Sequence, residues 1–363
     1  MSFLPRAAEA MIDLDALRHN VGRVRTLAPR SRILAMVKAD AYGHGLIAVS
    51  RVLSNEADGL GVACVPEGLA LREAGLGGRV VVMQGCKNDD ELAAAHAAGL
   101  DLVVHEPGQV ERLERYAAGA APLTIWLKVD TGMHRIGFEP EEIPALSARL
   151  QGMPAVAPGL RYVTHFACAD DPAAQAVTDR QVARFRAATD GLQGERSLCN
   201  SAGILTRADA HADWVRPGIM LYGASPLLGT TAMELDLKPV MTLQAPLIAI
   251  RICRAGEPIG YGGVYTCDHD TRVGILAIGY GDGYPRHAPS GTPVSVAGQV
   301  CTVIGRVSMD MLAVDLGAVD CKPGDKAVFW GGNPAVEVVA QGAQTISYEL
   351  LCAAGSKARR VYI

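Results

Sequence analysis

The chain has 363 residues, of which 49% are hydrophobic and 20% are charged, and its formal net charge is -4. This length and apolar content can bury a large core and favour two domains over one. The slight acidic excess and the lack of a Lys/Arg cluster argue against a nucleic-acid partner, because nothing would neutralise a phosphate backbone. Composition therefore favours small-molecule chemistry.

The nine cysteines stand singly, form no CxxC pair and are odd in number. This pattern is typical of reduced thiols in a cytoplasmic protein, and it predicts no structural metal. The opening stretch MSFLPRAAEAMIDL lacks the apolar run of a signal peptide, and no later run is long enough to span a bilayer. We therefore expect a cytoplasmic protein without a membrane partner.

The first predicted element is a helix capped by Asp13, with apolar residues at helical spacing up to Leu27 and a stop at Pro29. Segments of helix composition, such as 65–74, 89–98 and 178–192, then separate eight strand-like runs. These runs are Ile33–Val37, Gly59–Ala63, Val80–Met83, Leu102–Val104, Leu123–Val129, Leu160–Thr164, Ser197–Cys199 and Trp214–Val215. Parallel strands need crossovers, and eight such units close on themselves, so the alternation predicts a TIM-like (β/α)8 barrel within residues 1–235.

The composition changes beyond residue 235, where Gly and Pro punctuate short β-rich runs. These runs are Thr242–Arg251, Arg272–Ile278, Pro293–Val296, Val300–Ile304, Met311–Leu316 and Lys326–Trp330. Closely spaced turn signals of this kind indicate an all-β arrangement, joined by a final helix at 348–354. We therefore expect an α/β barrel followed by a C-terminal, mainly β domain at residues 236–363.

Polar residues follow five of the predicted barrel strands. They are Lys38 after the first strand, Lys128 and Asp130 at the fifth, His165 at the sixth, Asn200 and Ser201 at the seventh, and Arg216 at the eighth. Barrel enzymes carry their sites at the carboxyl ends of the strands, with a phosphate site after strands seven and eight. Ser201 offers a hydroxyl and the free N–H groups of a helix start, and Gly218 in the next loop lets the backbone come close, so both are suited to bind an anion. Each residue alone has an ordinary structural explanation, but their convergence on one face indicates an active site.

Strings of residues around these positions resemble the alanine racemase family. They are VKADAYGHG (37–45), LKVDTGMHRIGF (127–138), VTHFACAD (163–170), CNSAG (199–203), VRPGIMLYG (215–223), GEPIGYGGVY (256–265), AIGYGDGYPR (277–286) and GRVSMDML (305–312). The resemblance runs from Ala10 to about Tyr348, with departures at Asp40, at His134 and in the tail SKARRVYI. It implies a barrel and β-domain fold, the cofactor pyridoxal 5'-phosphate (PLP), and a homodimer with shared active sites.

The resemblance also implies a role for individual residues. Lys38 would bind PLP covalently and act as one catalytic base, and Tyr261 would be the second base. The other cofactor-binding residues would be Tyr42, His165, Asn200, Ser201, Arg216, Gly218, Ile219 and Tyr348. The substrate site would include Arg135 and Met309, with Tyr280 and Asp310 near its entrance. Lys128 matches a lysine that is carbamylated in many members; the alternative is a plain lysine facing chloride or solvent.

The expected function is interconversion of L-alanine and D-alanine by two bases, Lys38 for the proton of the D-isomer and Tyr261 for that of the L-isomer. Arg216 at the pyridine nitrogen would limit electron withdrawal and so suppress transamination. Two alternatives remain. An amino-acid decarboxylase with the same plan would recognise a second charged group, whereas Tyr280 and Met309 favour a narrow entrance. A non-catalytic PLP carrier would lack the β domain.

Overall fold

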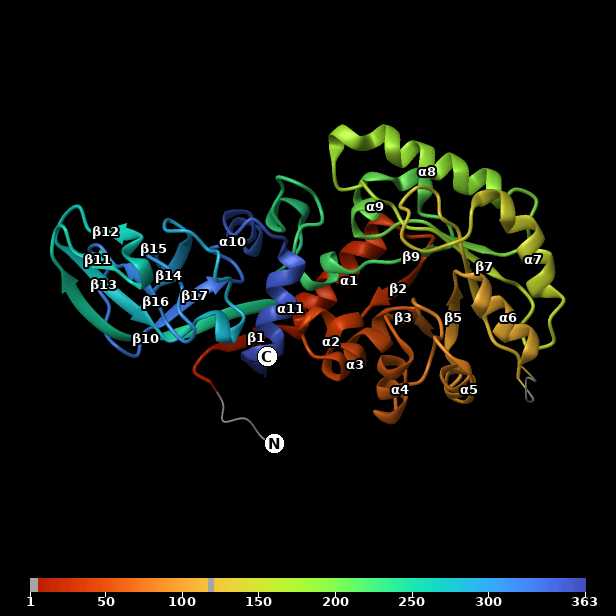
Figure 1. Cartoon of the computed structure of the whole chain (residues 1–363), viewed down its shortest axis with the longest axis horizontal. Helices are drawn as coiled ribbons and strands as arrows, with labels where there is room; N and C mark the ends of the chain where they lie inside the picture. The colour runs from red at the N-terminus through yellow and green to blue at the C-terminus, as the bar shows by residue number, and fades with distance from the viewer. Residues whose placement is uncertain (1–5, 117–120) are drawn as a thin grey trace.

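The computed structural model describes residues 6–116 and 121–363, so the first five residues of the opening stretch lie outside it. The barrel lies at one end of an elongated molecule, the C-terminal sheet lies at the other, and helix α11 (Ser347–Lys357) lies between them (Figure 1). In the described residues, no helix is long and apolar enough to cross a membrane.

Eight parallel strands, β2 to β9, close into the barrel that the alternation predicted. They are β2 (Arg32–Met36), β3 (Gly59–Val62), β4 (Val80–Val82), β5 (Asp101–Val104), β6 (Ile125–Lys128), β7 (Arg161–Val163), β8 (Glu195–Ser197) and β9 (Trp214–Val215). Strand β8 begins earlier than predicted because the charge of Glu195 is compensated. Its carboxylate accepts bonds from Trp214 at 2.8 Å and from Arg161 at 2.7 Å.

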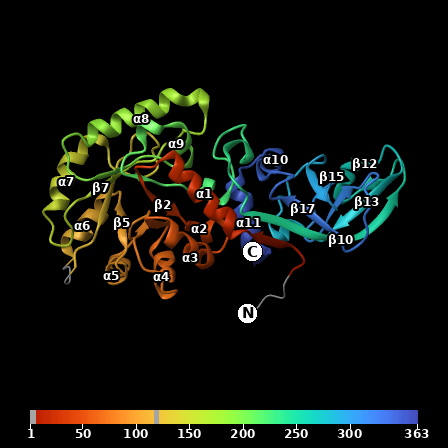
Figure 2. The ribbon, with the colours of Figure 1, turned by 180° about the vertical axis from the view of Figure 1, so that it is seen from behind.

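Helices cover the outside of the barrel. They are α1 (Leu14–Leu27), α3 (Leu46–Glu56), α4 (Val65–Glu73), α5 (Asp89–Ala97), α6 (Pro107–Arg115), α7 (Ile143–Gln151), α8 (Gln175–Ala188) and α9 (Ser201–Thr206), with 3-10 turns η1 (Pro140–Glu142), η2 (Pro172–Ala174), η3 (Ala208–Ala210), η4 (Ile219–Tyr222) and η5 (Met233–Leu235). Asp13 caps α1 as predicted, since its carboxylate accepts the backbone N–H groups of Asp15 and Ala16 at 2.9 Å. Seen from behind (Figure 2), α1 covers the side of the barrel nearest the junction.

The C-terminal part is built on an eight-stranded sheet in the order β13-β16-β15-β14-β17-β10-β1-β18. Its strands are β1 (Glu9–Ile12), β10 (Met241–Cys253), β13 (Thr271–Leu276), β14 (Pro293–Val296), β15 (Gln299–Ile304), β16 (Leu312–Asp315), β17 (Lys326–Trp330) and β18 (Arg359–Tyr362), beside a small ribbon of β11 (Pro258–Ile259) and β12 (Tyr265–Thr266). Helices α10 (Val336–Gly342) and α11, with turns η6 (Tyr261–Gly263) and η7 (Tyr280–Asp282), complete it. The long strand β10 runs from the junction to the far end (Figures 1 and 2).

The sequence pattern did not predict the short ribbon of β11 and β12, nor two strands of the large sheet that come from opposite ends of the chain. Strand β1 pairs antiparallel with β10, and β18 pairs in parallel with β1. Both have only four residues, so their strand character depends on this pairing across the whole length of the chain. The first strand therefore belongs to the sheet of the C-terminal part, although the barrel follows it directly.

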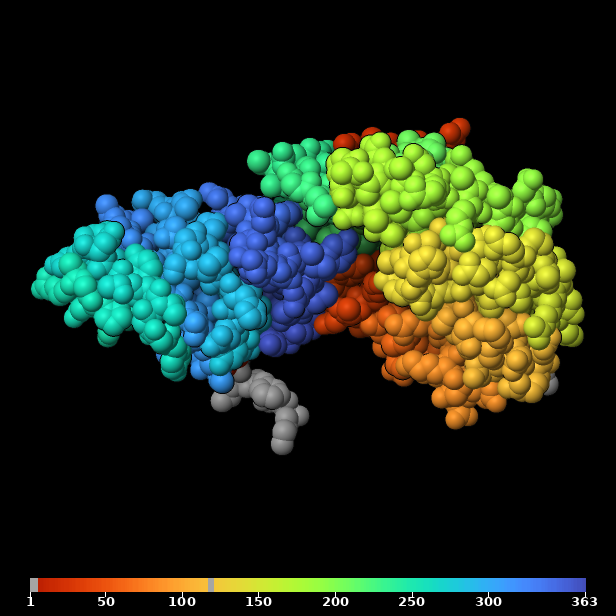
Figure 3. Space-filling model, turned by 45° about the horizontal axis from the view of Figure 1, so that its top comes forward, coloured from red at the N-terminus to blue at the C-terminus, as the bar shows by residue number. Residues whose placement is uncertain are grey.

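Apolar side chains fill the inside of the barrel in the described part of the chain. The interior cluster contains Leu34, Val81, Val103, Trp126, Val163 and Trp214, each at most 1% exposed. A second, larger cluster continues from the barrel helices into the C-terminal sheet. Figure 3 shows the surface hollowed between the C-terminal part (blue) and the barrel, with residues near the N-terminus (red) on the floor of the hollow.

Candidate active site

A pocket of about 810 Å³ opens at the carboxyl ends of the barrel strands. Predicted site residues from six segments line it: Lys38, Tyr42, Lys128, Arg135, His165, Asn200, Ser201, Arg216, Gly218, Ile219 and Tyr348. Tyr348 comes from α11, so the C-terminal part supplies one wall of the pocket in the same chain. The residues that the strand-end pattern selected thus lie around one cavity, except Asp130. Its carboxylate instead accepts backbone N–H groups of the loop that follows, at 2.9 to 3.1 Å.

Lys38 begins a backbone segment of unusual conformation, which we call the lysine turn (residues 38–42). The four residues that follow the lysine, Ala39 to Tyr42, have φ angles of 53° to 54°, in the left-handed region. Such a conformation costs L-residues roughly 1–2 kcal/mol each, so the surroundings must hold it. The turn begins directly after the predicted strand Ile33–Val37.

The amine of Lys38 is biased toward its neutral form. Burial lowers the pKa of Lys38, and the positive charges of Arg135 and Arg216 lower it further, while Glu67 acts in the opposite direction. A lysine needs a lone pair to attack a carbonyl group, and partial burial beside cations makes that form more accessible. Lys38 is therefore suited to be a nucleophile and a base.

Tyr42, Ser201 and Gly218 form a tight group in the lining of the same pocket as Lys38. The ring of Tyr42 stacks on Tyr222 with centroids 4.7 Å apart, which fixes its direction. A Cβ atom on Gly218 would lie 2.4 Å from the Tyr42 hydroxyl, so only glycine fits there. The N–H of Gly218 donates to the Ser201 hydroxyl at 2.8 Å. Hydroxyl groups and the start of turn η4 thus converge where an anion could be bound.

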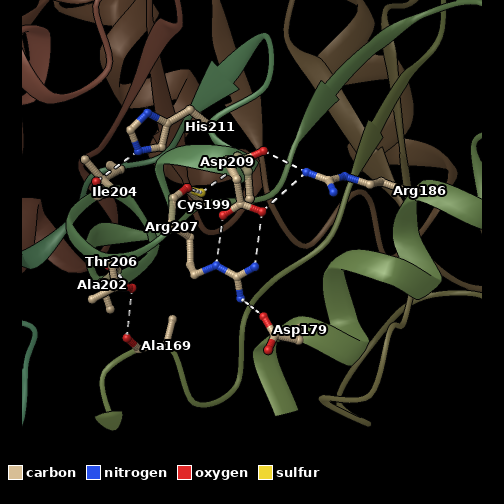
Figure 4. A network of polar contacts seen from close by, with 11 residues as sticks. Ala169, Asp179, Arg186, Cys199, Ala202, Ile204, Thr206, Arg207, Asp209 and His211 are labelled. Atoms are coloured by element: carbon tan, nitrogen blue, oxygen red, sulfur yellow. Dashed lines mark hydrogen bonds and ion pairs between the residues drawn. The ribbon is translucent and has the colours of Figure 1, made fainter. Parts of the chain in front are cut away.

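Helix α9, which begins with Ser201, is anchored from behind by polar contacts (Figure 4). His211 contacts the Ile204 carbonyl oxygen at 2.9 Å, and the Thr206 hydroxyl donates to the Ala169 carbonyl at 3.2 Å. Arg207 pairs with Asp179 at 2.7 Å and with Asp209 at 3.0 Å. These contacts hold the short helix in place although its own backbone makes few hydrogen bonds.

Arg216 is 3% exposed and fully engaged by the barrel. Its guanidinium donates to the Ser197 hydroxyl at 2.6 Å and to the backbone carbonyls of Thr164 and Leu198 at 2.5 and 3.1 Å, and it contacts His165 Nδ1 at 3.3 Å. Burial lowers the pKa of Arg216 to about 10, so the group is charged at neutral pH. The result is a fixed cation in the pocket wall.

Lys128 and His165 line the same pocket, and the surroundings of each favour its neutral form. Lys128 is 7% exposed, and its pKa lies well below the usual value because of burial and the nearby charge of Arg216. Burial and Arg216 also hold the pKa of His165 well below its usual value, so this imidazole is neutral. The guanidinium groups of Arg135 and Arg216 are thus the cations of the lining, and they favour a ligand that carries negative charge.

The comparisons with known proteins agree with this geometry. The family described as "Alanine racemase, N-terminal domain" matches residues 12–226, and "Alanine racemase, C-terminal domain" matches residues 240–362. The chain belongs to the alanine racemase family. The family and fold expected from the sequence strings are therefore confirmed, and the named relatives are enzymes of the racemase class.

Relatives of this family member match over nearly the whole chain. An alanine racemase of Thioalkalivibrio sulfidiphilus is 51% identical over 99% of both chains, and one of Halorhodospira halophila is 49% identical over 98% of both. Among solved structures, a biosynthetic alanine racemase from Pseudomonas aeruginosa superposes with a TM-score of 0.94 at 43% identity, covering 99% of each chain.

The remaining predicted residues of this alanine racemase family member lie on the C-terminal part. Tyr261 is 68% exposed and Met309 is 55% exposed. Tyr280 lies beside the Met309 loop, since its N–H donates to Ser308 and the next N–H donates to the Met309 carbonyl, and Asp310 pairs with Arg6 at 2.5 Å. None of these four predicted residues lines the pocket in the described part of the chain. A single chain thus does not bring Tyr261 to Lys38.

The sequence pattern did not indicate some of the residues that shape the site. Ser197 orients Arg216, Tyr222 supports Tyr42 and donates to the Met36 carbonyl at 2.8 Å, and Glu67 accepts from the backbone next to Lys38. Cys352 lines the pocket beside the lysine turn. Their positions in ordinary strands and helices carry no signal, although Tyr222 lies within one of the family strings.

His44, in the string after Lys38, leads to a prediction about acid stability. It is fully buried, its Nδ1 contacts the carbonyls of Tyr42 and Ala41 at 3.0 and 3.1 Å, and its Nε2 has no partner among the described residues. Burial lowers the pKa of His44 to about 4. In the unfolded chain the His44 imidazole takes up a proton near pH 6.5, whereas in the folded chain it stays neutral until about pH 4. The free energy of unfolding should therefore fall by roughly 3 kcal/mol as the pH drops from about 6.5 to about 4.

The measurement is urea unfolding between pH 7 and pH 4. His44→Asn keeps an N–H donor near the two carbonyls but removes the titrating ring, so its free energy of unfolding should fall less with pH than that of the unsubstituted protein. His287→Asn is the matched control, because His287 is exposed. Equal pH slopes for all three proteins would contradict the assignment.

Proposed function

We propose that the protein is a PLP-dependent alanine racemase that interconverts L-alanine and D-alanine. The observation that carries this proposal is that the half-buried Lys38, with a lowered pKa, lines one pocket together with the anion-binding group of Tyr42, Ser201 and Gly218. The names of the full-length relatives supply the substrate. The pocket itself suits a cofactor with an aldehyde and a phosphate, because its lining combines a nucleophilic amine, which can react with the aldehyde, and an anion site, which can bind the phosphate.

The residues present fit PLP well. Tyr42, Asn200, Ser201, Gly218, Ile219 and Tyr348 would surround its phosphate, and Arg216, oriented by His165, would meet the ring nitrogen. The missing Cβ of Gly218 supports this placement, because it leaves the Tyr42 hydroxyl and the backbone close together. When bound, PLP withdraws electrons from the α-carbon of the amino acid and makes its proton acidic.

Two bases on opposite faces are needed to invert the α-carbon. Lys38 would remove or return the proton of the D-isomer, and its lowered pKa makes the neutral amine available for this transfer. Tyr261 would handle the proton of the L-isomer. Arg135 and Met309 would bind the substrate, with Tyr280 and Asp310 shaping its entrance.

Tyr261 does not line the pocket of its own chain, so in the proposed mechanism a second copy would supply it. We propose a homodimer in which the C-terminal part of one subunit covers the barrel pocket of the other, giving two equivalent shared sites. In support, the face around Tyr261 exposes large apolar side chains, including Val264 at 54%, Met309 at 55% and Met311 at 46%. Single chains rarely expose such a group without a partner.

Lys128 is proposed to be carbamylated, with the plain lysine beside a bound chloride as the alternative. Its amine is buried beside Arg135 and Arg216, and its pKa is strongly lowered, so the neutral amine that reacts with CO₂ is favoured. Carbamylation would convert a costly buried cation into an anion that holds Arg135. Mass spectrometry of the native protein distinguishes the two, since only the carbamylated form carries the mass of one added CO₂.

Two further proposals concern the organisation of the chain. We propose a domain boundary at residues 235 and 236, between the barrel and the part that β10 begins. We also propose that the protein works in the cytoplasm, which agrees with nine free cysteines, several of them buried.

Arg216→Glu is predicted to change the reaction specificity. A carboxylate in this place would favour protonation of the ring nitrogen and stronger electron withdrawal, so racemisation should slow while transamination rises. The measurement is pyruvate formed per alanine racemised. Arg30→Glu, at an exposed position outside the pocket lining, is the control. A variant that forms no more pyruvate than the control would refute the role assigned to Arg216.

The direct test of the function is to incubate the purified protein with L-alanine and to follow optical rotation with and without added PLP. The proposal predicts that the rotation falls toward zero, that PLP is required, and that D-alanine gives the same end point. Release of CO₂ would instead indicate a decarboxylase, and retention of PLP without any turnover would indicate a carrier.

A further inference from the structure

The lysine turn is strained, and its own residues do not explain why it persists. Four consecutive non-glycine residues adopt left-handed angles, and Val37 before them makes no side-chain capping bond. Strain of this kind persists only where the surroundings over-determine the backbone. The turn also carries both Lys38 and Tyr42, so its geometry sets the distance between the amine and the anion-binding group.

One end of the turn is held by Glu67. This residue lies in the first turn of α4, and its two carboxylate oxygens accept different backbone groups: Oε1 from the N–H of Ala39 at 2.8 Å and Oε2 from the N–H of Ala63 at 2.7 Å. The carboxylate thus ties the residue after Lys38 to the end of the neighbouring strand β3. Its negative charge also acts on the Lys38 amine, against Arg135 and Arg216.

The other end is held by the tail of the chain. Arg360, in β18, donates to the Asp40 carboxylate and to the Gly43 carbonyl, and Asp40 Oδ1 accepts the N–H of Leu46 at 2.6 Å. Helix α11 packs so closely that a Cβ atom on Gly43 would lie 2.4 Å from the Leu351 carbonyl oxygen. The turn is therefore held by Glu67 of α4 on one side and by Arg360 and α11 on the other.

We propose that Glu67 and Arg360 are positioning residues that hold the lysine turn and so aim the Lys38 amine. This inference rests on the proposed function, because it assigns a role in the reaction of Lys38. Glu67 also sets the charge balance at that amine. Neither residue lines the pocket, so each acts through the backbone and the local field.

The first variant is Glu67→Gln in the PLP-loaded enzyme. Glutamine has only one acceptor oxygen, so either Ala39 or Ala63 loses its partner, and the negative charge disappears. We expect kcat to fall by about 10²-fold with a smaller change in KM, because the amine is misplaced rather than the substrate lost. We also expect the limb of the pH profile that belongs to Lys38 to move to lower pH. Glu73→Gln, exposed on the same helix, is the matched control.

A second readout does not depend on activity. Hydrogen exchange followed by mass spectrometry should show faster exchange in the peptide that contains residues 38–46 of Glu67→Gln than in Glu73→Gln, because the strained turn opens more often. If Glu67→Gln fails to fold, Arg360→Gln serves instead, with Arg359→Gln as its control, because Arg359 is exposed in the same strand and pairs with Glu9 rather than with the turn. Arg360→Gln should exchange faster than Arg359→Gln.

The proposed function and the positioning role of Glu67 can be refuted separately. If the unsubstituted enzyme does not racemise alanine, the proposed function fails, while the exchange measurement still tests the grip on the turn. If the unsubstituted enzyme is active, and Glu67→Gln matches Glu73→Gln in kcat, pH profile and exchange, then Glu67 does not position Lys38 and the inference is overturned.

Discussion

Replacing Lys38 by alanine is expected to lower the kcat of racemisation by about 10³-fold or more, since the variant loses both the covalent attachment of PLP and one of two bases. The pocket offers no equivalent amine on that side, because Lys128 lies at the end of β6, buried beside Arg216. The measurement is racemisation at saturating alanine and PLP. Lys322→Ala, at an exposed position, is the control.

A chemical experiment separates attachment from general damage. Borohydride reduction of the PLP-loaded enzyme, followed by peptide mapping, should place the pyridoxyl group on Lys38, and Lys38→Ala should carry no label there. A label on Lys128 or Lys357 would contradict the assignment of the attachment site.

Mixing two inactive variants is expected to restore activity. Lys38→Ala and Tyr261→Ala should each be nearly inactive, because each lacks a base at every site. In a mixed dimer one site carries both defects and the other carries none, since Lys38 and Tyr261 of one site come from different subunits. If subunits exchange at random at equal concentrations, about a quarter of all sites should be intact.

The control for this mixing experiment is a proof of exchange, for example by native mass spectrometry of differently tagged subunits. Activity that stays at the level of the separate variants, despite proven exchange, would show that Tyr261 acts within its own chain or is not the second base. We expect restored activity, because Tyr261 is exposed in the single chain and does not line the pocket of that chain.

Much of the fold was predictable because local signals repeat. Apolar runs alternating with helix composition located all eight barrel strands, and polar residues after them located the pocket. The strands β1 and β18 were not predictable, because Glu9–Ile12 and Arg359–Tyr362 become strands only by pairing with each other and with β10. Such pairing joins the two ends of the chain and leaves no local pattern.

The chemistry of the site was only partly predictable. Lys38 and Arg216 stood out because charged residues at buried strand ends need an explanation, and the structure shows both in one cavity. The sequence pattern does not indicate the left-handed lysine turn or the hydrogen bonds that Glu67 accepts, since these depend on backbone angles and on contacts between separate segments. Tyr261 was selected through the family resemblance alone, and its glycine-flanked turn would otherwise read as an exposed loop.

Racemisation by this protein requires two bases that act on opposite faces of the α-carbon. The most direct test follows loss of the α-proton from each alanine isomer in deuterium oxide by NMR, using PLP-loaded Tyr261→Phe. Lys38 should still exchange the proton of D-alanine, whereas exchange from L-alanine should fall by about 10²-fold or more. Equal exchange from both isomers, or selective exchange from L-alanine, would contradict the assignment of Lys38 to the D-face and Tyr261 to the L-face.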